Sequence, residues 1–301
     1  MTKIKTLILF ALFLPLALSC SATRDFHKTS VGCSSCAGDG KDFPLSEIYD
    51  STMLIAGVIV DKGKKKEIGS YTGSGGVVWQ AKDSTIVMTA AHVCHVPELI
   101  ESIKKISPNP DDIKHQIKVT DRKNRTYSAI SYVSAKDFDV CLIQISKIEG
   151  VRALPLASKA PELGEIIYNV ASPLGLYSSH GSPMFTGYYS GDFKFVNVEQ
   201  DKHSLYSLPA APGSSGSLLL NKHMEVVGVV SAVYTRFHHL TISATLDQIK
   251  DLMNGGAKTV EKVFIDFTPQ IVVEEKVFLW GQDVPEWDIL EENEEERWKI
   301  K

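Results

Sequence analysis

The chain has 301 residues, of which 44% are hydrophobic, 23% charged and 9% aromatic, and its formal net charge is -4. This balance is typical of a folded globular protein and argues against an intrinsically disordered or collagen-like chain. The slightly negative charge gives no basic excess for binding nucleic acid, and five cysteines are too few for a small scaffold held by disulfides.

The first 19 residues have the pattern of an export signal. Lys3 and Lys5 precede an apolar run, residues 7–18, that is too short for a membrane-spanning helix but suits a signal peptide. The run ends in Leu-Ser-Cys20, which resembles the lipobox of bacterial lipoproteins, where the chain is cut before a cysteine that receives lipid. The pattern predicts export to the cell envelope, with Cys20 as a membrane anchor. Plain secretion and an uncleaved N-terminal anchor are the alternatives.

Composition divides the remaining chain into three parts. Residues 20–48 are predicted to form a flexible tether, since they are rich in small and polar residues without periodicity. Residues 49–254 carry short apolar runs between turn residues, which is typical of an all-β domain. Residues 255–301 form a C-terminal extension, in which residues 283–296 hold eight acidic side chains. Such a run is usually a solvated tail, and partner binding is the alternative.

In chain order, the apolar runs predict strands that include Met53–Val60, Gly75–Gln80, Thr85–Thr89, Gln116–Thr120, Val140–Ile145, Ile166–Val170, Met184–Ser190, Val226–Val233 and Thr241–Ala244. Residues 61–67 predict a hairpin tip between strands. A short helix is expected over Pro97–Ile106. A second is expected over Leu246–Met253, because its apolar residues have helical spacing and glycine follows it. Two further strands are expected in the extension, over Val260–Phe267 and Gln270–Trp280.

Three segments carry residue types suited to nucleophilic catalysis. An apolar run ends in Thr-Ala-Ala-His92, Asp139 stands directly before another apolar run, and Ser215 lies in a Gly-Ser-Ser-Gly turn before a third. Taken singly, they suit a structural histidine, a carboxylate that caps a turn, and an ordinary loop. Together, in this order and on a β-rich background, they resemble the His, Asp and Ser of trypsin-like serine proteases, especially the bacterial exported and glutamyl-endopeptidase types.

The resemblance covers roughly residues 50–254. It implies an all-β fold of two six-stranded antiparallel β-barrels, about residues 49–150 and 151–254, with a short C-terminal helix. It implies that His92 is the general base and acid, that a buried Asp139 orients it, and that Ser215 is the nucleophile. Asp137 is the alternative to Asp139. The main-chain N–H groups of Gly213 and Ser215 would form the oxyanion hole.

The same resemblance implies where the first specificity pocket lies. The residues expected there are Pro209 at the floor, beside Ala210, and Ser231 and Val233 in the walls. No acidic side chain stands at the floor, so a demand for Arg or Lys before the cleaved bond is not expected. A shallow apolar pocket for small to medium residues is expected instead. The alternative is a preference for acidic residues before the cleaved bond, if His238 and His239 reach the pocket.

The cysteines beyond Cys20 form two pairs. Cys33 and Cys36 form a Cys-x-x-Cys motif, but no buried strand precedes it and no helical pattern follows, which argues against a thioredoxin-like redox role. A small local disulfide in the tether is expected instead. Cys94 and Cys141 each lie two residues after an expected catalytic residue, so the resemblance brings them close enough for a disulfide. Two buried free thiols are the alternative. No metal or other cofactor is expected, because no second ligand pair accompanies Cys94 and the histidines beside it.

The sequence therefore predicts an exported serine endopeptidase that cleaves protein or peptide substrates through an acyl-enzyme. No nucleic-acid partner is expected, and no feature indicates the oligomeric state. The alternative is a protein of protease fold without activity, which binds a partner through its acidic tail. The Ile-Val-Gly-Gly start of trypsin-type activation is absent, so the site is expected to form without cleavage.

Overall fold

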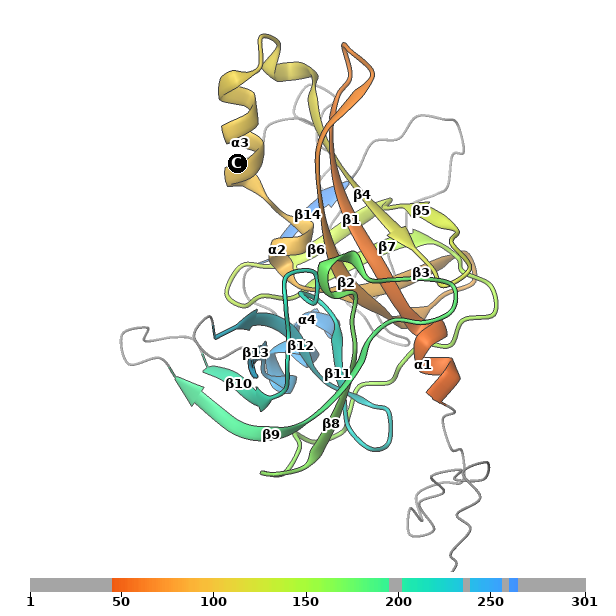
Figure 1. The fold of residues 1–301 in the computed structure, drawn as a ribbon, viewed down its shortest axis with the longest axis vertical. Helices are drawn as coiled ribbons and strands as arrows, with labels where there is room; N and C mark the ends of the chain where they lie inside the picture. The colour runs from red at the N-terminus through yellow and green to blue at the C-terminus, as the bar shows by residue number, and fades with distance from the viewer. Residues whose placement is uncertain (1–44, 195–201, 235–238, 256–259, 265–301) are drawn as a thin grey trace, which may run out of the picture. The chain divides into compact units, whose positions relative to one another are not determined.

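Two antiparallel β-structures form the framework of the described chain (Figure 1). The computed structural model describes residues 45–194, 202–234, 239–255 and 260–264. The first β-structure is a sheet of eight strands in the order β14-β6-β7-β3-β2-β1-β4-β5. Its strands are β1 (Thr52–Asp61), β2 (Lys66–Gln80), β3 (Ser84–Thr89), β4 (Ile113–Thr120), β5 (Thr126–Ser128), β6 (Ser131–Ala135), β7 (Cys141–Ser146) and β14 (Val260–Phe264).

The second β-structure is a closed barrel of six strands in the order β10-β13-β12-β11-β8-β9. Its strands are β8 (Ile166–Val170), β9 (Met184–Lys194), β10 (Lys202–Ser207), β11 (Leu218–Leu220), β12 (Val226–Val233) and β13 (Leu240–Ala244). In the sequence, the six barrel strands lie between β7 and β14, which both belong to the first sheet. After the barrel, the chain returns to that sheet, where β14 pairs with β6.

The open first sheet differs from the closed six-stranded barrel that was expected there. The cause is a bend in residues 126–135, where β5 pairs with β4 while β6 pairs with β7 and β14. Consecutive residues at the bend bond to opposite parts of the sheet. The N–H of Ala129 donates to the Ile117 carbonyl (2.9 Å), and the N–H of Ile130 donates to the Gln144 carbonyl (2.8 Å). The chain itself therefore connects the two parts, and the described strands form no ladder that closes them.

Both expected helices are confirmed with the expected bounds, as α3 (Pro97–Ile106) and α4 (Leu246–Met253). The start of α4 is fixed by a capping box, in which the Thr245 hydroxyl accepts from the main-chain N–H of Gln248 and the Gln248 side chain accepts from the N–H of Thr245. The remaining helical segments are α1 (Leu45–Ser51), α2 (Ala91–Cys94) and the 3₁₀ turns η1 (Pro110–Asp112) and η2 (Pro173–Gly175).

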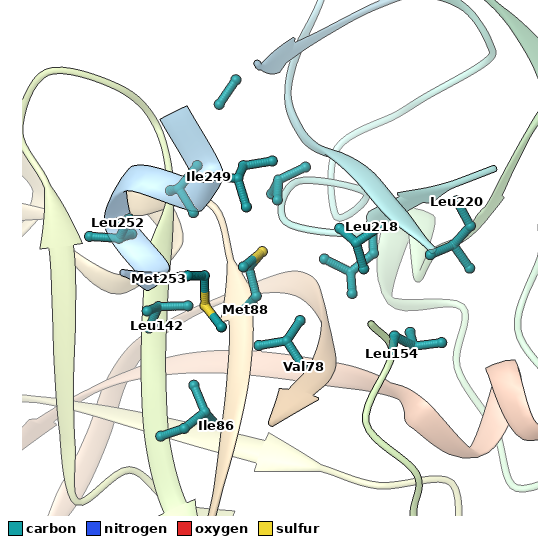
Figure 2. Close-up of a cluster of buried hydrophobic side chains, with 14 of the residues drawn as sticks. Val78, Ile86, Met88, Leu142, Leu154, Leu218, Leu220, Ile249, Leu252 and Met253 are labelled. Carbon is teal, nitrogen blue, oxygen red and sulfur yellow. The ribbon is translucent and has the colours of Figure 1, made fainter. Parts of the chain in front are cut away.

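One hydrophobic cluster joins the sheet, the barrel and α4 (Figure 2). Its members come from several elements and include Val78, Ile86, Met88, Leu142, Leu154, Leu218, Leu220, Ile249, Leu252 and Met253. Apolar burial contributes roughly 25 cal/mol for each Å² removed from water, so this shared core stabilises the two β-structures against one another. The strands that end near this core carry the candidate site.

Helix α1 begins within the stretch that was expected to be tether. Its residue Ile48 is 1% exposed and belongs to the shared cluster. Ser51 at its end donates a hydrogen bond to the Arg152 carbonyl (2.6 Å). Residues 45–48 are therefore part of the folded body. Among the described residues, no helix is both long and apolar enough to cross a membrane.

Candidate active site

His92 lies on the one-turn helix α2, directly after β3. The buried strand ends at Thr89, Ala90 is extended, and the helical turn begins at Ala91. Val93 and Cys94 of the same turn are buried, which leaves His92 on its exposed side. The strand and the turn together present an imidazole to solvent from a rigid base.

Asp139 holds His92 through both of its carboxylate oxygens. Oδ1 accepts a hydrogen bond from the main-chain N–H of His92 (2.9 Å), and Oδ2 lies 2.8 Å from the ring Nδ1. A ring nitrogen bound to a carboxylate carries the proton, so Nε2 is left as the basic atom. The hydrogen bond that the His92 ring donates to Asp139 raises the pKa of His92, and partial burial opposes that change.

The exposure of this pair differs from the expectation of a buried carboxylate. The Asp139 side chain is 29% exposed and that of His92 is 50% exposed. Asp137, the alternative considered from the sequence, is exposed, and the described residues include no hydrogen-bond partner for its carboxylate. The structure thus brings Asp139, and not Asp137, to His92.

A disulfide lies beside this pair. Cys94 and Cys141 are bonded, with their Cα atoms 6.5 Å apart, which confirms the first of the two alternatives for these cysteines. The bond connects α2 to the first residue of β7, next to Asp139. Cys20, Cys33 and Cys36 lie outside the described residues.

Ser215 lies in the loop that leads into β11. Two glycines with positive φ shape this loop, Gly213 (φ +93°) and Gly216 (φ +85°). The Ser215 carbonyl accepts from the N–H of Ser74 on β2 (2.7 Å), and the N–H of Gly216 donates to the Val230 carbonyl on β12 (2.7 Å). The loop is therefore bonded to the sheet on one side and to the barrel on the other.

Close packing brings this loop to the segment that carries His92. A Cβ atom added to Gly216 would collide with the hydroxyl of Thr89, which lies two residues before α2. A Cβ atom added to Gly73 would lie 2.8 Å from Cγ1 of Val93 and 3.2 Å from the Ser215 carbonyl oxygen. Gly73 thus lies between Val93, the residue after His92, and Ser215, and a larger residue than glycine does not fit there.

The two expected oxyanion donors, the N–H groups of Gly213 and Ser215, have no acceptor among the described residues. The neighbouring amides in the loop are used: that of Ser214 donates to the Ala211 carbonyl (2.8 Å) and that of Ser217 to the Ser214 carbonyl (3.0 Å). Unpaired N–H groups next to a nucleophile can bind the negative oxygen of a tetrahedral intermediate.

The expected specificity residues lie at the barrel end of the site. Ser231 occupies an irregularity of β12, between Val230 and Ala232, and its hydroxyl lies 3.5 Å from the Asp139 carbonyl. Val233 is half-buried and packs with Ala210 against the barrel core. The shallow apolar pocket stays a prediction from the sequence. Pro209 is half-buried and His239 is exposed, whereas His238 is outside the described residues.

A second histidine lies next to α2. The Tyr71 hydroxyl donates to the Val93 carbonyl (2.9 Å) and lies 2.8 Å from Nε2 of His115. Since the hydroxyl has one proton, His115 is the donor in the second bond. Burial, with a smaller contribution from His95, lowers the pKa of His115 to about 4. His115 is therefore neutral at pH 7 and supports the turn that carries His92.

Sequence reasoning missed Ser74, which bonds to the loop that carries Ser215. The signal for it was the run Gly73-Ser74-Gly75-Gly76 inside a strand, because glycines in a strand mark a close approach of another chain segment. Within the described part of the chain, no group of three or more His, Cys, Asp or Glu side chains is arranged to hold a metal ion.

Comparison with known protein families gives a match that covers the region of this site. The family model described as a trypsin-like peptidase domain matches residues 73–229, slightly more than half of the chain. The matched region contains His92, Asp139 and Ser215. No curated protein matches the chain.

Proposed function

Because this chain belongs to the trypsin-like peptidase family, we propose that it is a serine endopeptidase with His92, Asp139 and Ser215 as its catalytic residues. The observation that carries this proposal is the double hydrogen bond from His92 to Asp139 (2.9 and 2.8 Å) beside the Ser215 loop. A histidine fixed in this way has one free ring nitrogen, directed away from the carboxylate.

In the proposed mechanism, Nε2 of His92 takes the proton of the Ser215 hydroxyl as Oγ attacks the carbonyl carbon of the substrate. The carboxylate of Asp139 stabilises the imidazolium that forms. The unpaired N–H groups of Gly213 and Ser215 receive the oxyanion. His92 then gives its proton to the leaving amine, which produces an acyl-enzyme. A water molecule, activated by the same nitrogen, hydrolyses the acyl-enzyme and restores the serine.

Labelling with a fluorophosphonate probe tests the nucleophile. We expect the full chain to be labelled at Ser215 and to cleave casein or a peptide library. Ser215→Ala and His92→Ala are expected to lose labelling and about 10⁶-fold in turnover. Ser128→Ala, which changes an exposed serine on β5, is the matched control and keeps both. An unlabelled wild-type protein that binds a partner through residues 283–296 would support the scaffold alternative instead.

The pocket residues support a preference for small to medium apolar residues before the cleaved bond. Val233 packs against the barrel core together with Ala210. A difference of one methylene in such a pocket changes the free energy by only about 1–3 kcal/mol, so the preference is modest. A cleavage profile of a peptide library measures it. A profile dominated by Arg, Lys or Glu contradicts this part of the proposal.

Export and anchoring rest on residues 1–20, outside the described part of the chain. We propose that Cys20 is lipidated and holds the enzyme at the cell envelope. Cys20→Ala is expected to release the protein from the membrane fraction without changing its activity on a soluble peptide. The mass of the mature N-terminus shows whether lipid is attached, and unchanged fractionation of the variant would rule out this anchor.

A further inference from the structure

The two peptide groups around Gly213 are each held by one hydrogen bond from a different part of the fold. The Pro212 carbonyl, in the preceding peptide, accepts from the main-chain N–H of Leu174 in η2 (2.7 Å). The Gly213 carbonyl, in the following peptide, accepts from the hydroxyl of Ser74 on β2 (2.7 Å). Neither peptide can therefore rotate without losing a bond.

These bonds determine where the Gly213 N–H points. In a planar trans peptide, the C=O and the following N–H lie on opposite sides. Because Leu174 holds the Pro212 carbonyl, the Gly213 N–H is turned away from η2, and it has no acceptor among the described residues. The direction of a candidate oxyanion donor thus depends on residues that do not touch the substrate.

Ser74 connects this loop to the rest of the site through all of its polar atoms. Besides donating to Gly213, its hydroxyl accepts from the N–H of Ser172 (2.8 Å). Its N–H donates to the Ser215 carbonyl (2.7 Å), and its carbonyl accepts from the Thr89 hydroxyl, two residues before α2 (2.7 Å). Ser74 is 0% exposed, so each of these bonds is shielded from water.

The backbone of Leu174 is held in an unfavourable conformation. Its φ of 53° and ψ of 25° lie in the left-handed region, which is unfavourable for a residue with a side chain. Its side chain is 75% exposed, so burial does not compensate that cost. Such strain persists where surrounding bonds over-determine the backbone, and here the bond to Pro212 is one of them.

We propose that Ser74 is a positioning residue for the oxyanion hole, and that the main-chain N–H of Leu174 acts with it from the other side of Gly213. Together they hold the Gly213 amide toward the position of the oxyanion before substrate binds. This inference rests on the proposed function, since it assigns a role in that reaction to residues outside the triad.

A pair of buried serines provides the kinetic test. Ser74→Ala removes the bond to Gly213. Ser243→Ala is the matched control, because the Ser243 hydroxyl is also 0% exposed, accepts a main-chain N–H (Val229, 2.8 Å) and donates to a carbonyl (Ala244, 2.7 Å). We expect Ser74→Ala to lower kcat roughly 10- to 100-fold with KM within about two-fold, below the full loss of an oxyanion donor. Ser243→Ala is expected to keep kcat.

Inhibition by a peptidyl trifluoromethyl ketone separates positioning from general damage. Its tetrahedral adduct carries an oxyanion, so its Ki is expected to rise in Ser74→Ala by the same factor by which kcat/KM falls. Equal losses in Ser74→Ala and Ser243→Ala, or a Ki that does not rise, would overturn the proposal.

Leu174 gives a second variant in case Ser74→Ala does not fold. Leu174→Pro removes the N–H that holds Pro212. Because proline cannot adopt a φ of 53°, it also changes the backbone of this exposed turn, so the Pro212–Gly213 peptide loses both constraints. Leu176→Pro is its control, because Leu176 has a φ of -69° that proline adopts, and its N–H donates to Pro173 instead (2.9 Å). We expect at least a ten-fold loss of kcat in the first variant only. Similar activity in the two variants contradicts the role of Leu174.

Amide NMR of the ¹⁵N-labelled full chain decides the positioning without turnover. The Gly213 and Ser215 amide resonances are expected to shift or broaden in Ser74→Ala and to stay unchanged in Ser243→Ala. An inactive, unlabelled wild-type protein would mean that the proposed function fails, and the amide spectra would still report whether Ser74 holds Gly213. An unchanged Gly213 resonance in Ser74→Ala would overturn the inference itself.

Discussion

The carboxylate of Asp139 contacts His92 at two points, one on the main chain and one on the ring. The main-chain bond fixes where the carboxylate sits relative to α2, and the ring bond then fixes the imidazole. One residue thus sets both the position and the tautomer of the candidate base.

Asp139→Asn is expected to lower kcat about 10⁴-fold, because an amide can present its N–H₂ to Nδ1 and favour the wrong tautomer. Asp137→Asn is the control on an exposed neighbour and is expected to stay within two-fold. Steady-state kinetics on a peptide substrate measure both variants. If Asp137→Asn is the damaging change, the pairing seen here is not the catalytic one.

The pH dependence of the rate follows from the raised pKa of His92, which Asp139 stabilises in its charged form. Only neutral imidazole accepts the serine proton. We expect kcat/KM to rise with pH through a midpoint above ~6.5, the ordinary value for histidine, and to vanish toward lower pH. A pH profile between 5 and 9, recorded where the protein stays folded, tests this. A rate that is constant down to pH 5 would argue against a histidine base.

At the scale of single residues, short sequence motifs predicted the candidate site where the chemistry requires particular residue types. Thr-Ala-Ala-His92 and Gly-Ser-Ser215-Gly led to segments that the fold brings against one another. The glycines around Ser74 mark a close approach of another segment, but the role of its hydroxyl could not be predicted, because it depends on partners that are distant in sequence. The partial exposure of Asp139 was also missed, since burial depends on neighbours that are distant in sequence.

Among the elements, β7 and α2 are joined by the Cys94–Cys141 disulfide, which closes a 47-residue separation. Loop-closure entropy gives a stabilisation of up to about 4 kcal/mol for this length, with ~2–4 kcal/mol typical of measured cases. The double variant Cys94→Ala/Cys141→Ala is expected to unfold at correspondingly lower urea concentration. Reductant should destabilise only the wild-type protein. Equal unfolding midpoints for the two proteins would contradict this contribution.

Element boundaries followed the sequence where apolar periodicity was strong, as in α3 and α4. They failed where strands are polar. β10 (Lys202–Ser207) reads Lys-His-Ser-Leu-Tyr-Ser and was not predicted, although it closes the barrel between β9 and β13. β2 begins at Lys66, earlier than the predicted Gly75, because its first half lies in an exposed hairpin with β1. Pairing with a neighbour, and not composition, makes these segments strands.

For the whole molecule, α1 fills part of the core shared by the sheet and the barrel. Ile48→Ala removes a side chain that is 1% exposed, so we expect a loss of roughly 2–5 kcal/mol in the free energy of unfolding. Ile106→Ala on α3 is the control, since Ile106 is 84% exposed. It is expected to change stability by less than ~0.5 kcal/mol. Urea unfolding measures both, and similar losses would show that α1 does not contribute to the core.

Overall stability is also expected to depend on His115, whose pKa is lowered to about 4 by burial and by His95. The unfolded chain binds the proton near pH 6.5, so the stability is complete above that pH and is lost as pH falls toward 4. His115→Gln retains an N–H donor for Tyr71 without titrating. Urea midpoints at pH 7, 6 and 5 are expected to fall more steeply for wild type than for this variant. Parallel curves would contradict the assignment.

The pairing of β14 with β6 constrains the order in which the chain can be assembled. During synthesis, β6 leaves the ribosome long before β14, because all six barrel strands lie between them in the sequence. Until β14 emerges, the edge of β6 is an open template for another copy of the chain. Completion of the first sheet is therefore a late, long-range event, of the kind that slows folding. A chain truncated after Gly255 is expected to keep its barrel strands and to self-associate through β6. In the full chain, residues 260–264 are therefore expected to cover this edge and to prevent such aggregation.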